Sequence, residues 1–164
     1  MTVQPLMSFD PKGNETGFRT ALGSFATGVT LITTDSPEGP VGIVANSFTS
    51  VSLDPPLVLW CPAKSSRRFE HFAGSRRFAI HVLAEDQRNI ADAFSKSKTA
   101  FESIPHHKSH CGMPLIDNAL ATLECSLHSD HDAGDHLIIV GEVTKCHRRE
   151  GNPLIYFNGQ YGAL

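Results

Sequence analysis

Short runs of apolar and β-branched residues, separated by turn residues, dominate the pattern of this chain and predict a mainly β protein. Residues 29–34 and 41–45 are two such runs, and the turn-rich segment DSPEGP between them indicates a hairpin. The Asn158 and Gly159 pair predicts a tight hairpin near the C-terminal end, because Asn-Gly is preferred in type I′ turns. The other predicted strands are residues 57–61, 78–83, 119–128, 137–146 and 154–157.

Helical spacing in the N-terminal part predicts one amphipathic helix. Five apolar residues recur at positions that share a helix face, namely Phe18, Ala21, Leu22, Phe25 and Ala26. Asn14 or Thr16 could cap the start, and Gly28 is placed to end the helix in a left-handed conformation. Residues 1–13 lack this spacing, so we expect a flexible arm there, followed by a single domain over residues 14–164.

Two further short helices are predicted, followed by a long loop. One carries Phe69 and Phe72, and the other covers residues 84–94, where Ile90 and Phe94 would anchor it. Residues 95–118 lose all periodicity, and loops of that length are often functional. Strands that meet mostly through turns, with about three short helices, favour an antiparallel barrel over a parallel α/β sheet.

Composition narrows the class of partner. An apolar content of 40% and a charged content of 19% are typical of a globular domain. The net charge of −3 and the pI near 6.3 give no basic stripe for nucleic acid or for a membrane surface. No targeting segment or apolar span is recognisable, so we expect a cytoplasmic protein. Its four widely spaced cysteines are expected to be reduced thiols: Cys61, Cys111, Cys125 and Cys146.

A polar stretch lies between two apolar strands in residues 42–62, GIVANSFTSVSLDPPLVLWCP. Its short side chains would let a flat ligand with polar edges approach the backbone closely, although an ordinary Ser/Thr-rich edge strand would have the same sequence. These short polar residues are Asn46, Ser47, Thr49, Ser50 and Ser52.

The segment KSSRR, residues 64–68, offers hydroxyls and cations ahead of the predicted helix with Phe69, and Ser65 or Ser66 would cap that helix. This combination suits an anion such as phosphate, although Ser-capped basic helix starts are common. No G-x-G-x-x-G follows a strand, which argues against a Rossmann site.

Together these segments resemble the short-chain flavin reductases, which supply reduced flavin to two-component monooxygenases. The resemblance covers nearly the whole chain, and its most specific part is the NSFTSVSLDPP block, followed by GDH and then Y-x-x-G-x-Y. Other matching pieces are FATGVTLITT (25–34), KSSR (64–67), RRFAIHVLAEDQ (76–87) and GMPLIDNALATLEC (112–125).

The resemblance implies a Greek-key-like, antiparallel FMN-binding split barrel. It also implies a homodimer with flavin at or near the subunit interface, and a flavin-dependent monooxygenase as the partner that receives reduced flavin. The implied activity is that of an NAD(P)H:flavin oxidoreductase, in which hydride passes from NADH or NADPH to N5 of FMN or FAD.

The resemblance also implies roles for single residues. His136 would orient the nicotinamide and could donate a proton as the catalytic residue, although a turn histidine paired with Asp135 would look the same. The other residues implied at the nicotinamide are Tyr156, Gly159 and Tyr161. Those implied at the flavin phosphate are Ser65, Ser66 and Arg67. Those implied along or near the flavin ring and ribityl chain are Thr27, Gly28, Val29, Ala45, Asn46, Ser47, Ser50, Val51 and Ser52.

Two features depart from the family pattern. His81 stands where the family usually has Asn, and flavin selectivity would differ if that position contacts flavin. The run HHKSHC, residues 106–111, fits no regular zinc spacing, so we expect a solvated loop and no metal. A flavin- or haem-binding barrel without turnover and a split-barrel oxidase with bound flavin are the alternative functions; the nicotinamide-facing segments favour the reductase.

Overall fold

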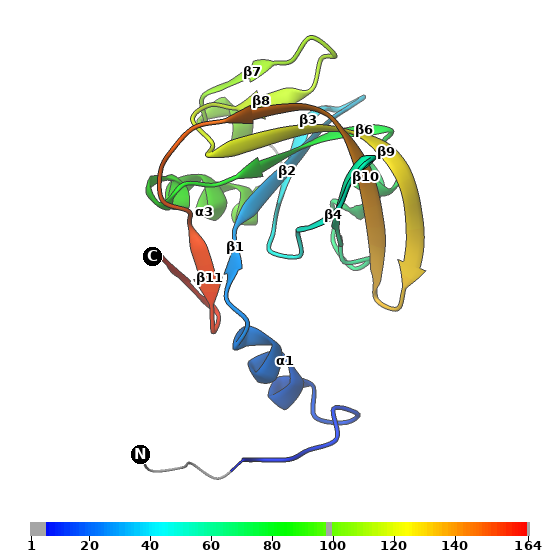
Figure 1. Cartoon of the computed structure of the whole chain (residues 1–164), viewed down its shortest axis with the longest axis vertical. Helices are drawn as coiled ribbons and strands as arrows, with labels where there is room; N and C mark the ends of the chain where they lie inside the picture. Colours follow the sequence, from blue (N-terminus) through cyan, green and yellow to red (C-terminus); the bar gives the residue numbers. More distant parts are fainter. Residues whose placement is uncertain (1–5, 98–99, 164) are drawn as a thin grey trace.

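A curved antiparallel sheet of seven strands forms the centre of the computed structural model, which describes residues 6–97 and 100–163 (Figure 1). The strand order is β3-β2-β6-β9-β10-β5-β4, so β3 and β4 are the two edges although only residues 46–48 separate them in sequence. The antiparallel barrel predicted from the sequence is confirmed, and its hydrogen bonding is interrupted between β3 and β4. The strand bounds are β2 Thr30–Ser36, β3 Gly39–Ala45, β4 Thr49–Leu53, β5 Pro56–Trp60, β6 Arg77–Val82, β9 Ala121–Ala133 and β10 His136–Arg148.

The barrel interior is filled by apolar side chains from several strands, with one aromatic cluster at its centre. Trp60 is fully buried and packs edge-on against Phe72, with ring centroids 5.2 Å apart, and against Phe78 at 6.1 Å. Each such ring contributes roughly 1.5–3 kcal/mol by leaving water. This cluster fixes the end of β5, the strand that follows the polar residues singled out in the sequence.

Helix α3, Arg88–Lys96, follows the 3-10 turn Glu85–Gln87 and packs on β3. Ile90 and Phe94 are buried, as the sequence predicted. Gly42 allows a close approach, because a Cβ there would lie 2.6 Å from the Phe94 ring. The C-terminal end of α3, with Ser95, is thereby brought next to the end of β3.

A second, small sheet joins the two ends of the domain. Its strands are β1 Thr27–Gly28, β11 Ile155–Phe157 and β12 Gln160–Gly162, in the order β1-β11-β12. The turn between β11 and β12 is the predicted tight hairpin, since Asn158 and Gly159 have φ values of 48° and 79°. Gly28 pairs with Ile155, so the prediction that Gly28 ends the first helix is wrong.

Helix α1, Glu15–Gly23, begins where the sequence predicts, because the Asn14 side chain accepts a hydrogen bond from the Gly17 N–H at 3.0 Å. Its apolar face is not covered: Leu22 is 58% exposed, and Phe25, just after the helix, is 77% exposed. The chain continues from this helix into β1, and Figure 1 shows the helix outside the barrel. Residues 6–13 form neither helix nor strand, and residues 1–5 of the expected arm lie outside the described residues.

Two local predictions differ from the structure. Helix α2, Phe69–Ala73, begins after Arg68, so neither Ser65 nor Ser66 caps it; the Ser66 hydroxyl instead accepts the Arg68 N–H at 3.2 Å within a preceding turn. The expected long loop contains the 3-10 turn Ala100–Glu102 and a hairpin, β7 His106–Lys108 with β8 Pro114–Ile116.

The tip of the β9–β10 hairpin also differs from the prediction. Strand β9 continues to Ala133, past the predicted end at residue 128, whereas β10 begins at His136, next to the predicted start at residue 137. Cross-strand pairing continues here through a polar segment without apolar alternation. Among the described residues, no helix is long and apolar enough to cross a membrane.

Candidate functional site

The interruption of the barrel between β3 and β4 opens onto a groove. Three adjoining cavities, of about 220, 390 and 650 Å³, share Ser95 as a lining residue. Ala45 and Asn46, at the end of β3, line the first two, and Ser66 lines the second and third. The groove therefore runs from the C-terminal hairpin, past the interrupted edge of the sheet, to the turn before α2.

The middle of the groove is built by residues 45–47 and by the segment after β5. The Ser47 hydroxyl accepts the Cys61 N–H at 2.9 Å and lies 3.3 Å from the Cys61 carbonyl oxygen, to which it can donate. This hydroxyl therefore holds the two sides of the opening together. Asn46 and the backbone beside it remain available to a ligand, since residues 46–48 lie outside the strands of the sheet.

One end of the groove is cationic. Three cationic side chains line it, Arg67 and Arg68 from the turn before α2 and Lys96 from the end of α3. The pKa of Arg68 is lowered, first by its burial and then by the neighbouring charge of Arg67. The hydroxyl-bearing residues beside these cations are Ser65, Ser66, Ser95 and Ser97.

The opposite end is aromatic. Tyr156 and Tyr161 face each other across the C-terminal hairpin with ring centroids 5.4 Å apart, and both line the smallest cavity together with Val29. The guanidinium of Arg88 lies 5.4 Å from the centroid of the Tyr161 ring, so Tyr161 is held from both sides.

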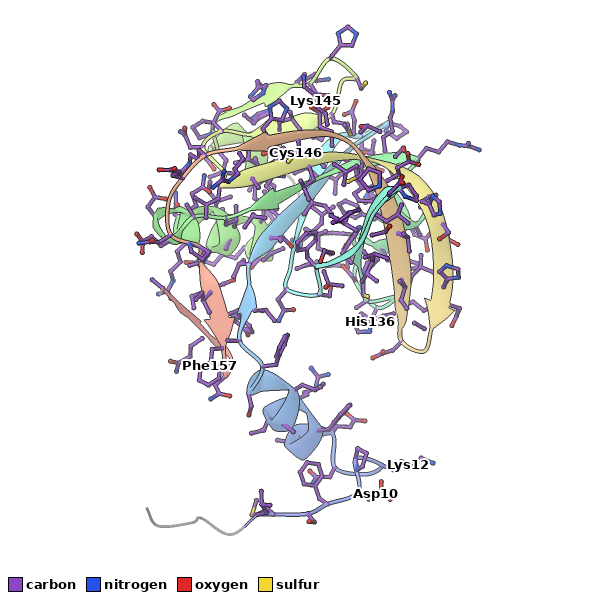
Figure 2. The ribbon with its side chains drawn as sticks, viewed as in Figure 1. Asp10, Lys12, His136, Lys145, Cys146 and Phe157 are labelled. Atoms are coloured by element: carbon purple, nitrogen blue, oxygen red, sulfur yellow. The ribbon has the colours of Figure 1, made fainter. Side chains whose placement is uncertain are left out.

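His136 lies on the wall of the middle cavity, at the turn end of β10 (Figure 2). Its Nδ1 is 2.7 Å from Oδ1 of Asp135, and this hydrogen bond is the first cause that lowers the Asp135 pKa, followed by the charge of His136. The ring nitrogen left for a ligand is Nε2. His136 therefore both pairs with Asp135 and lines the groove, so the two interpretations of this residue given in the sequence analysis are compatible.

The tip that carries His136 is fastened to the cationic turn. Lys64 Nζ donates to Asp132 Oδ2 at 2.6 Å and to the Gly134 carbonyl at 2.7 Å. The Lys64 N–H also donates to the Asp135 carbonyl at 2.9 Å, and Ala63 forms a β-bridge with His136. The conformation of the tip is thus tied to that of residues 63–68.

Several residues implied by the sequence lie outside these three cavities. Ser50, Val51 and Ser52 are on the edge strand β4, where the pairing with β5 has an irregularity between Ser50 and Ser52. Thr27 and Gly28 lie beside the aromatic end, paired with Tyr156 and Ile155, and Gly159 forms the hairpin turn.

His81 does not line the groove. It is fully buried on β6, with Nδ1 at 3.0 Å from the Leu31 carbonyl and Nε2 at 3.1 Å from the Ile116 N–H. An Nδ1–H tautomer satisfies both contacts, and burial lowers the pKa of His81 to about 4. This neutral histidine joins the β7–β8 hairpin to the barrel, so its difference from the family's usual Asn concerns packing.

The predicted solvated histidine loop is partly a strand. His106 and His107 lie on β7, and His107 Nδ1 contacts Oδ1 of Asp117 at 2.7 Å. Within residues 6–97 and 100–163, no group of three or more potential ligands is arranged to hold a metal ion.

The groove residues that sequence reasoning missed include Trp60, Arg68, Ser95 and Lys96. Arg68 adjoins the predicted phosphate residues and could have been included with Arg67. Ser95 and Lys96 were assigned to a loop, whereas α3 extends through them. Only the packing of α3 on β3 shows that they reach the groove.

The groove has the chemistry of a site for a flat ligand with an anionic tail. The aromatic and middle regions offer apolar walls and backbone, and the other end offers cations and hydroxyls. The Thr27 hydroxyl, beside the aromatic end, is buried and has no partner within the described chain, so it can still bond to a ligand. A split antiparallel barrel with this groove defines the class of flavin-binding barrels.

Comparison with known proteins identifies the family within that class. The model of the flavin reductase like domain matches residues 22–164, so this chain belongs to the flavin reductase-like family. This confirms the resemblance noted in the sequence. An FMN reductase (NADH), SmoA, of Agrobacterium fabrum is 50% identical over 155 residues, covering 94% of this chain and 89% of the relative.

Two further relatives are similar in sequence and structure. The reductase subunit HsaB of a flavin-dependent monooxygenase from Rhodococcus jostii is 44% identical over 149 residues, covering 90% of this chain and 76% of HsaB. The structure of the NADH:FAD oxidoreductase SgcE6 of Streptomyces globisporus has a TM-score of 0.90 and 35% identity, covering 98% of this chain and 93% of SgcE6.

Proposed function

We infer that this chain is an NADH-dependent flavin reductase that supplies reduced flavin to a partner flavin-dependent monooxygenase. The single observation that carries the proposal is the groove at the split of the barrel, which combines a cationic end, an open backbone edge and His136 in a chain of this family. The names of the relatives, an FMN reductase (NADH) and a monooxygenase reductase subunit, support the activity predicted from the sequence.

In this proposal the groove positions the flavin by its two ends. Ser65, Ser66 and Arg67 hold the phosphate, and Ala45, Asn46 and Ser47 lie along the ring and ribityl chain. When bound, the flavin supplies the acceptor for the hydride of the reduced nicotinamide. The chain itself has only to align the two rings and exclude other geometries. Ser50, Val51 and Ser52 would approach the ligand from outside these cavities, along the exposed edge of β4.

His136 is proposed to orient the nicotinamide through Nε2. The lowered pKa of Asp135 keeps that carboxylate ionised, and its bond to Nδ1 fixes the ring orientation. Tyr156, Gly159 and Tyr161 belong to the hairpin at the aromatic end, where they would close one side of the stacked rings.

The test is steady-state NADH oxidation by purified protein in air-saturated buffer, where oxygen reoxidises reduced flavin, with and without added FMN or FAD. No covalent anchor or adenylate-binding Rossmann site is recognisable, so we expect a pale protein whose turnover depends on added flavin. A retained yellow cofactor that is reduced and reoxidised in place would instead support an oxidase with bound flavin. Flavin binding without NADH oxidation would support a binding protein.

We also propose that the chain is a homodimer. The apolar face of α1 is exposed next to the exposed Phe25, and a second copy would remove this surface from water. Sedimentation or light scattering should then give about twice the 17.8 kDa chain mass. A fully active monomer would contradict this proposal.

We further propose that the protein acts in the cytoplasm. NADH is available there, and the four cysteines are all free, as expected of a reducing compartment. Fractionation of cells that express the tagged chain would test this.

A further inference from the structure

The cationic end of the groove carries more charge than a singly charged phosphate needs. Arg67, Arg68 and Lys96 line one cavity of about 650 Å³, and none of the described residues that line it is acidic. Lys64, the cation that precedes Arg67 in the sequence, forms an ion pair with Asp132 and does not line this cavity. Three cations from two separate elements therefore converge on one cavity.

These three cations form no ion pair with another described residue. Across residues 6–97 and 100–163, no acidic side chain pairs with Arg67, Arg68 or Lys96, whereas the nearby Arg88 is paired with Asp92 at 3.8 Å. Arg68 is half-buried beside the like charge of Arg67, and this lowers its pKa. A half-buried cation beside an exposed like charge is stabilised when an anion binds between the two.

Flavins differ in the charge that they would bring to this cavity. The phosphate of FMN is a terminal monoester with a charge of about −1.5 to −2 at pH 7 and a second pKa near 6. In FAD the same phosphorus belongs to a pyrophosphate, whose two negative charges are spread over two phosphorus atoms and do not titrate in this range. Riboflavin carries no phosphate. Only FMN places both charges on the three terminal oxygens of one phosphorus, and this compact dianion matches a cavity on which three cations converge.

We propose that the cluster of Arg67, Arg68 and Lys96 makes this reductase selective for FMN, by binding its phosphate as the dianion. This inference rests on the proposed function and specifies the flavin that the same groove takes. Arg68 also lines the middle cavity, so the selective charge is continuous with the part of the groove assigned to the ring.

Riboflavin and FAD serve as controls for the titration of other charged groups on the neighbouring elements. Glu70 and His71 lie on α2, Asp92 on α3, and His136 faces the adjoining cavity. Riboflavin and FAD meet the same neighbours as FMN. A pH dependence that only FMN shows therefore originates in its phosphate.

The test measures dissociation constants of FMN, FAD and riboflavin at pH 7.5 and 5.5, through quenching of Trp60, the only tryptophan in the chain and a residue of the groove wall. At pH 7.5 we expect FMN to bind about tenfold or more tightly than FAD or riboflavin, the factor that one additional charge-assisted hydrogen bond provides. At pH 5.5 the preference should shrink severalfold, because the phosphate gains its second proton.

Two variants and a matched control separate this cluster from general effects of charge. Lys96→Gln and Arg68→Gln should each weaken FMN binding by about tenfold while changing riboflavin binding little. Lys145→Gln removes the same charge far along β10 from His136 (Figure 2) and should leave all three constants unchanged.

Two results separate this inference from the proposed function. Equal affinities for FMN and FAD, or a preference that does not change with pH, would overturn the selectivity while leaving a flavin reductase. Failure of every flavin to support NADH oxidation would overturn both.

Discussion

Removing the buried His81 should change how stability depends on pH, with a magnitude that follows from its environment. Burial lowers the pKa of His81 to about 4, while a hydrogen bond to the Leu31 carbonyl opposes this shift. The ordinary histidine pKa of 6.5 applies in the unfolded chain. Between these two pH values the unfolded chain binds a proton that the folded chain does not, so the free energy of unfolding falls as the pH drops.

The size of the effect can be calculated from the two pKa values. Relative to pH 8, the single proton on His81 destabilises the fold by about 2 kcal/mol at pH 5 and by about 3 kcal/mol at pH 4. Protonation would also remove the acceptor for the Ile116 N–H, since Nε2 would become a donor. The β7–β8 hairpin is therefore expected to loosen first.

The measurement is equilibrium denaturation of the wild type and of His81→Asn at pH 7.5 and 5.0, at one protein concentration. At pH 7.5 the variant should be less stable, because it loses one of the two ring contacts. At pH 5.0 the gap should narrow by about 2 kcal/mol, because only the wild type has the buried ring to protonate. His110→Asn, at an exposed position, is the control. A gap of the same size at both pH values would refute the reasoning.

The remaining predictions concern the groove and the surface. Arg67→Ala should raise the KM for FMN about tenfold or more with little change in kcat, and leave the KM for riboflavin unchanged. His136→Ala should lower kcat/KM for NADH with near-normal flavin binding; equal losses for both substrates would contradict its assignment. Leu22→Glu should shift the sedimenting species toward the monomer mass if α1 lies in a dimer interface. Gly159→Ala should lower stability by about 1–2 kcal/mol in thermal denaturation, because its φ of 79° suits glycine.

Most strands could be predicted because their signals are local. The hairpin of β2 and β3 and the Asn158–Gly159 turn follow from β-branched runs and turn residues next to one another in sequence. The hairpin of β7 and β8 could not, because contacts distant in sequence hold it: the Thr33 hydroxyl donates to the Pro114 carbonyl at 2.6 Å, and Ile116 bonds to His81.

The same distinction applies to the groove. Ser66 and Arg67 could be proposed from a short basic segment, and they line the cationic cavity. Lys96 reaches that cavity only because Gly42 lets the Phe94 ring approach β3. The outward position of α1 was also not predictable, since amphipathic spacing indicates that a face is apolar but not what covers it.

The anchoring of Lys64 to the β9–β10 tip has a mechanical consequence. The turn that carries Ser66 and Arg67 and the tip that carries His136 are joined by two side-chain bonds, a backbone bond and a β-bridge, so they move as one unit. A displacement at the phosphate end of the groove is therefore transmitted to His136. In the proposed function, loading of the flavin tail would thereby set the position of His136, the residue proposed to orient the nicotinamide, and the two substrates would share a common reference frame.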